Sequence, residues 1–163
     1  AVLAAWPAQG AEPLFSLERV SLYGPAALYE ARTGQDAQGM AQFVDGVEDI
    51  ASKWSAAHPD LPALTGVVVV VVKPGGRLRA WIVTHGGDVP TDVKAGLKEQ
   101  IEAMEKVVPV SGPLVFGFAF KLRGGGTKPE GYPSPFPSDW SRVMFRRGSG
   151  VSDAVLLEVW PDE

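Results

Sequence analysis

His85 and Asp88 stand close together in the segment THGGD, at the end of a predicted strand. Loops that follow strands often carry catalytic residues, because the strand holds them in place. A histidine beside a carboxylate can act as the general base of a small hydrolase. The two glycines and the aspartate are equally typical of a plain turn between a strand and a helix. His85 and Asp88 are therefore the catalytic candidates, with a structural turn as the alternative.

Three residues of the segment RLRAWIVT are suited to binding another molecule: Arg77, Arg79 and Trp81. The segment alternates with period two, so these three side chains share one face of a predicted strand. Trp and Arg are enriched at binding hot spots, and an acidic or aromatic peptide fits such a face, docked on it or added to the sheet. The alternative is that Trp81 packs on its neighbours' aliphatic stems and under a helix at 36–57.

Composition and motifs argue against other kinds of chemistry. The chain has no cysteine, which excludes thiol catalysis and disulfides, and its two histidines lack the spacing of a metal site. The glycines at 124–126 lack the lysine and serine of a phosphate loop, and no GxSxG motif occurs. We expect neither a metal nor a cofactor. The net charge of −4 does not favour nucleic acid as a partner.

The elements that must position these residues are clearest between Val67 and Leu122. Six valines, a KPGG turn and an alternating segment predict a β-hairpin. A helix over 92–108 follows, with Val93, Leu97, Ile101, Met104 and Val108 on one stripe. The segment LVFGFAFKL then predicts a strand with three phenylalanines on one face, and we expect the helix stripe to cover this face.

A second principal helix is predicted over 36–57, with Asp36 as its N-cap. We expect it to cover part of the face opposite the helix at 92–108. An edge strand is predicted at 14–22, and two closing strands at 142–147 and 154–160, with Val155, Leu157 and Val159 facing the core. A long loop rich in glycine and proline at 123–139 fits a linker, a binding loop or disorder.

These elements predict a single α+β domain over 14–163, with a mainly antiparallel sheet and two principal helices. The alanine-rich segment 1–13 predicts either a flexible N-terminus or the remnant of a signal peptide, and therefore export. No apolar run is long enough to span a membrane. Nothing in the sequence indicates an oligomeric state.

The order of elements over roughly 64–122 resembles the C-terminal domain of TonB-type energy transducers. Gly66 stands where that family has a glycine before its first strand, and residues 75–76 and 85–87 stand at its two turns. The family's upstream Tyr-Pro pair, its Trp-Arg-Phe-type helix end, its membrane anchor and its proline-rich spacer are missing. The resemblance implies a periplasmic protein that binds other proteins, without energy transduction itself.

We therefore expect an exported, periplasmic or secreted protein that binds a protein or peptide partner through Arg77, Arg79 and Trp81. Two alternatives remain open. One is a small hydrolase that uses His85 and Asp88. The other is an exported inhibitor such as an immunity protein, with which the small size, the acidity and the long loop at 123–139 agree.

Overall fold

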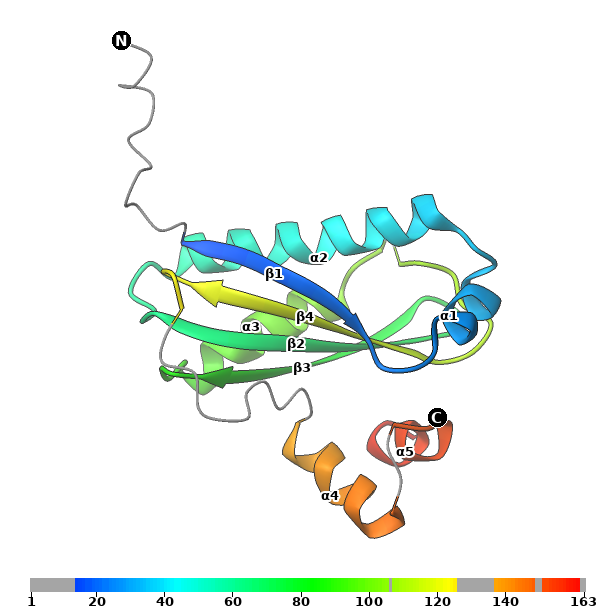
Figure 1. The fold of residues 1–163 in the computed structure, drawn as a ribbon. Coiled ribbons are helices and arrows are strands. Elements are labelled where there is room, and N and C mark those ends of the chain that lie inside the picture. Colours follow the sequence, from blue (N-terminus) through cyan, green and yellow to red (C-terminus); the bar gives the residue numbers. More distant parts are fainter. Residues whose placement is uncertain (1–13, 106, 126–136, 149–150, 162–163) are drawn as a thin grey trace.

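The computed structural model describes residues 14–105, 107–125, 137–148 and 151–161, so the predicted N-terminal segment 1–13 lies outside these ranges. The elements follow in the order β1 (Phe15–Leu22), α1 (Ala26–Thr33), α2 (Ala37–Ala57), β2 (Leu64–Lys73), β3 (Arg77–His85), α3 (Thr91–Glu102), β4 (Leu114–Leu122), α4 (Ser138–Arg147) and α5 (Asp153–Val159). The sheet has the order β1-β4-β2-β3, and all neighbouring strands are antiparallel (Figure 1). The predicted single α+β domain is confirmed.

The valine-rich strand β2 lies inside the sheet and is buried along its whole length. It continues into β3 through a tight loop at residues 74–76, where Gly75 and Gly76 have φ angles of 88° and 73°. Glycine adopts such angles without steric cost. The KPGG segment thus closes the predicted hairpin and fixes its register, with Lys73 opposite Arg77.

Alternation along β2 divides the apolar core into two clusters. Val68, Val70 and Val72 face α2 and α3, together with the three phenylalanines of β4, Phe116, Phe118 and Phe120. Val67, Val69 and Val71 face the opposite way, toward Trp140 of α4 and Leu156 of α5. The predicted packing of the phenylalanine face against the helix stripe is confirmed.

The expectation that the helix at 36–57 covers the opposite face is wrong, because α2 and α3 pack on the same face of the sheet. One crossover runs from β1 past β4 to β2, and the other runs from β3 past β2 to β4. Both join parallel strands. The second crosses the sheet in the opposite direction, and its strands also point the opposite way. These two reversals cancel, so right-handed connections place both helices on one face. The second face is covered by α4 and α5 instead (Figure 1).

The two closing strands predicted at 142–147 and 154–160 are wrong, because these segments belong to the helices α4 and α5. Gly148, with a left-handed φ of 66°, caps the end of α4. Ser152 caps the start of α5, where its hydroxyl accepts a hydrogen bond from the Val155 N–H at 3.3 Å. These are ordinary helix stop and start signals. Helical geometry buries Leu156 and leaves Leu157 50% exposed, so Leu157 does not face the core, whereas Val155 does.

Other boundaries also differ from the sequence interpretation. The helix predicted over 92–108 ends at Glu102. Pro109 disfavours a helical conformation at Val108, so the predicted end at 108 was too far along the chain. The edge strand β1 is confirmed, and α1 was not predicted. Most of the predicted loop 123–139 lies outside the described residues, and α4 already begins at Ser138. Among the described residues, no helix has the length and apolarity needed to cross a membrane.

Candidate binding groove along β3

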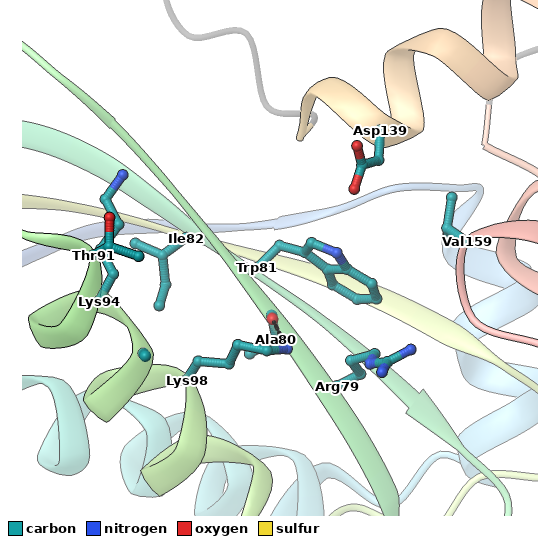
Figure 2. A pocket seen from close by; sticks show the side chains of 10 residues that line it. Arg79, Ala80, Trp81, Ile82, Thr91, Lys94, Lys98, Asp139 and Val159 are labelled. Atoms are coloured by element: carbon teal, nitrogen blue, oxygen red, sulfur yellow. Dashed lines mark hydrogen bonds between the residues drawn. The ribbon is translucent and has the colours of Figure 1, made fainter.

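The strand β3 lies at the edge of the sheet, and a cavity of about 490 Å³ runs beside it. We call this cavity the β3 groove. Its walls come from β3, α3, α4 and α5, and it is lined by Arg79, Ala80, Trp81, Ile82, Thr91, Lys94, Ala95, Lys98, Asp139 and Val159. Figure 2 shows Lys94 and Lys98 reaching from α3 on one side of β3, while Asp139 and Val159 approach from α4 and α5 on the other. The groove therefore follows the strand edge that no other described strand covers.

Trp81 is half-buried and takes part in both the core and the groove. Its ring packs edge-to-face on Trp140, with 5.0 Å between the ring centroids and 79° between the planes. The Lys98 ammonium lies 5.5 Å from the Trp81 ring centroid, close enough for a cation–π contact. Trp81 thus does not lie under α2, and it offers the rest of its surface to the groove.

The groove has an excess of positive charge. In the described part of the chain, neither Arg79 nor Lys94 has a carboxylate within salt-bridge distance, and the Arg79 guanidinium lies 5.8 Å from the Trp160 ring centroid. Asp139 is the acidic residue of the lining, and its carboxylate lies 3.8 Å from Arg142. A chain of net charge −4 thus presents two cations beside a tryptophan, an arrangement suited to a carboxylate-bearing partner.

Two side chains of α3 bind the backbone of β3 in the middle of the groove. The Ala80 N–H donates to Glu102 Oε2 at 2.9 Å, and Lys98 Nζ donates to the Ala80 carbonyl at 2.8 Å. Lys98 and Glu102 also pair with each other at 2.5 Å. The four-residue spacing of Lys98 and Glu102 places them next to each other on one face of α3 and explains this pairing. Its contact with Ala80 was missed, because it depends on which strand lies at the edge.

The predicted trio of binding residues is divided between two cavities. Arg77, Arg79 and Trp81 do share one face of β3, opposite Lys73, Val71 and Val69. Arg79 and Trp81 line the β3 groove, whereas Arg77 lines a neighbouring cavity of about 330 Å³ that also includes Lys73.

The side chain of Lys73 is involved in holding the end of α5. Lys73 is only 4% exposed, donates to the Trp160 carbonyl at 2.6 Å and lies 4.4 Å from the Trp160 ring centroid. The Arg77 guanidinium lies 5.9 Å from the same centroid. Arg77 therefore contributes to packing around Trp160 and does not line the groove.

The cavity that Asp88 lines does not include His85, the other catalytic candidate. His85 is half-buried at the end of β3, and exposed Asp88 lines a different cavity of about 430 Å³ with His58 and Asp60. Among the described residues, no group of three or more His, Asp and Glu side chains is arranged to hold a metal ion. The structure thus adds no geometry that favours the hydrolase alternative.

The residues that sequence reasoning missed are Lys94, Lys98, Glu102, Asp139 and Val159. The regular spacing of charges on α3 was the only signal for Lys94, Lys98 and Glu102, and it does not show which charges face a neighbouring strand. Asp139 and Val159 belong to α4 and α5, which the sequence interpretation took for strands. Comparisons with protein-family models, with curated proteins and with solved structures find no match to this chain, so they neither support nor oppose the resemblance to TonB C-terminal domains.

Proposed function

We propose that this chain is a binding protein that takes an extended, acidic segment of a partner protein into the β3 groove. The observation that carries the proposal is the pair Arg79 and Lys94, two cations without a described carboxylate partner beside the half-buried Trp81. A carboxylate beside either cation gains a charge-assisted contact, and the tryptophan supplies apolar area next to Arg79.

The position of the groove supports an extended segment as the ligand. An edge strand presents backbone N–H and C=O groups that an incoming peptide can pair with, while its side chains fit pockets on alternating sides. Side chains of a segment lying along β3 alternate between the side of Lys94 on α3 and the side of Arg79 and Trp81. Acidic residues suit both sides.

The test uses the capped heptapeptide Glu-Glu-Thr-Thr-Glu-Glu-Thr, which presents glutamate to both sides of an extended segment, with its lysine-threonine counterpart as the charge control. We expect the glutamate peptide to bind, the lysine peptide not to bind, and Arg79→Ala with Lys94→Ala to weaken binding about tenfold or more. Calorimetric titration measures the affinity. The matched variant Lys53→Ala removes an exposed lysine of α2 and leaves binding unchanged. Equal affinity for both peptides, or no effect of the groove variant, contradicts the proposal.

We also propose that the protein works after export, in the periplasm or outside the cell. The support is the alanine-rich, apolar segment 1–13 and the resemblance over 64–122. Fractionation of cells that express the natural gene tests this directly. Recovery of the protein with a cytoplasmic marker enzyme contradicts it, without affecting the proposed binding site.

A further inference from the structure

Ala80 shows which backbone groups of β3 point away from the sheet. Its N–H and C=O are taken by Glu102 and Lys98 of α3, so both point toward the free edge. The two groups of one residue in an antiparallel strand point to the same side, and this side alternates along the strand. The register between β2 and β3 runs without a shift. Ile82 and Thr84 therefore also point to the free edge, while Trp81 and Val83 bond to β2.

Lys98 and Glu102 form the two backbone hydrogen bonds of Ala80 that a neighbouring strand would otherwise form. The carboxylate accepts what a strand carbonyl would accept, and the ammonium donates what a strand N–H would donate. We call these two side chains the Ala80 clamp. They are partly buried, with exposed fractions of 38% and 26%, and are held together by their own ion pair. In the described part of the chain, no strand pairs with β3 beyond the clamp, at Ile82 and Thr84.

We infer that the Ala80 clamp determines the register of the partner segment, a step that rests on the proposed function. A segment bound along β3 pairs its backbone with Ile82 and Thr84 and stops at Ala80, because the clamp already satisfies that residue. The partner's acidic side chains are thereby fixed relative to Lys94 and Arg79. Lys98 and Glu102 are thus specificity-determining residues that act on the partner's position through the strand edge.

A second copy of this chain is a poorer occupant of the same edge. An antiparallel pairing of two β3 strands centred near Leu78 would bring Arg77 and Arg79 of one copy near the same residues of the other, and like charges on adjacent strands are destabilising. The clamp also closes the middle of the edge against such pairing. The observations therefore favour a segment of opposite charge.

The experiment compares the wild type with Lys98→Met and Glu102→Leu combined, using the glutamate-threonine heptapeptide as the probe. Backbone amide spectra and hydrogen exchange report on each position. In the wild type, we expect the peptide to protect the Ile82 and Thr84 amides and to leave the Ala80 amide signal in place. In the variant, the Ala80 amide exchanges freely without peptide and becomes protected with it. The amides of Trp81 and Val83 are the internal control, since β2 already protects them.

The affinity gives a second readout. Opening Ala80 adds up to two backbone hydrogen bonds to the peptide, so we expect the variant to bind about two- to tenfold more tightly. Lys98→Arg keeps a donor at the clamp and should behave like the wild type. If the double variant does not fold, Glu102→Leu alone frees the Ala80 N–H, and the exchange of this amide with and without the peptide gives the same test.

The outcomes separate the two proposals. Binding with the same affinity and the same protected amides in wild type and variant overturns the role of the clamp and leaves the proposed function standing. If neither the wild type nor the variant binds the peptide, the proposed function is overturned. Sedimentation of the peptide-free variant as a dimer overturns the choice of a partner segment over a second copy.

Discussion

Gly66 and Gly96 illustrate how the same residue type is required at one position and merely tolerated at another. A Cβ on Gly66 of β2 would lie 2.5 Å from the Phe120 ring and 2.9 Å from the Val83 carbonyl oxygen. Gly96 of α3 has open space around it, with no atom within 4 Å of an added Cβ. The absence of a side chain at Gly66 makes room for the ring of Phe120, its cross-strand neighbour on β4, whereas glycine at Gly96 only weakens a helix.

We therefore expect Gly66→Ala and Gly96→Ala to shift the free energy of unfolding in opposite directions. Gly66→Ala should destabilise by about 1–3 kcal/mol, because the backbone oxygen of Val83 cannot move away cheaply. Gly96→Ala should stabilise by about 0.5–1 kcal/mol, through the lower entropy of the unfolded chain. Urea unfolding of both variants measures the difference. Destabilisation by both would mean that the surroundings of Gly96 are not open.

At the scale of one element, α5 is the sharpest test of the fold, because a strand and a helix bury different residues of the same segment. A strand over 154–160 would bury Leu157 with Val155 and Val159, whereas the helix buries Leu156 to 3% exposure and leaves Leu157 50% exposed. Leu156→Ala should therefore cost about 2–5 kcal/mol of unfolding free energy. Leu157→Ala should stay within about 0.5 kcal/mol of the wild type. A larger loss of stability for Leu157→Ala than for Leu156→Ala would show that this segment is a strand and not a helix.

The elements that the sequence predicts well are those whose signals are local. The valine run with its KPGG turn, and the stripe of α2 from Phe43 to Trp54, each specify one structure within a few turns or pleats. α4 and α5 are short, so their apolar spacing fits a strand nearly as well as a helix, and Ser152 was overlooked as a cap.

Only the part of the β3 groove that depends on local signals could be predicted from the sequence. Period two places Arg79 and Trp81 on one face of β3, and this follows from the sequence alone. That β3 is an edge strand and that Lys94 and Lys98 lie beside it depend on the crossover through α3. These contacts join segments that are distant in the sequence, so no local sequence pattern predicts them.

The contact between α4 and α5 should respond to acid. Glu158 of α5 is hydrogen-bonded to Arg146 and lies 3.5 Å from Arg147. Desolvation raises the pKa of the Glu158 carboxyl, but the hydrogen bonds and charges of Arg146 and Arg147 outweigh it and hold this pKa below its ordinary value. A carboxylate with a lowered folded pKa stabilises the fold above its unfolded pKa, and this contribution disappears as the pH falls through the folded pKa.

Comparison of the wild type with Glu158→Gln isolates this effect. We expect the difference in unfolding free energy between the two proteins to be constant near neutral pH and to shrink below about pH 4, the usual range of a glutamate. Urea unfolding in a series of buffers measures it. A difference that grows on acidification would contradict the sign of the pKa shift.

At the scale of the whole molecule, the two faces of the sheet are covered unequally. The face of α2 and α3 contains the large cluster with Phe43, Trp54 and the phenylalanines of β4. The other face depends on a few side chains of α4 and α5, chiefly Trp140 and Leu156, together with ion pairs such as Arg32 to Asp153 at 3.0 Å. Less buried apolar area means a smaller free energy of local opening. The wall of the β3 groove formed by Asp139 and Val159 therefore belongs to the less stable side.

We expect native-state hydrogen exchange to separate these two sides. Amides of α5 should exchange through a partial opening at low denaturant, whereas amides of β2 should exchange only through global unfolding, because β2 is buried throughout. α2 is the matched control, since it is also a helix but has five buried residues along its length, and its central amides should follow β2. Leu156→Ala should lower the opening free energy of α5 more than that of α2. If the α5 amides merge with those of β2 at every denaturant concentration, then α4 and α5 are part of the main cooperative unit, and the groove opens only when the whole sheet unfolds.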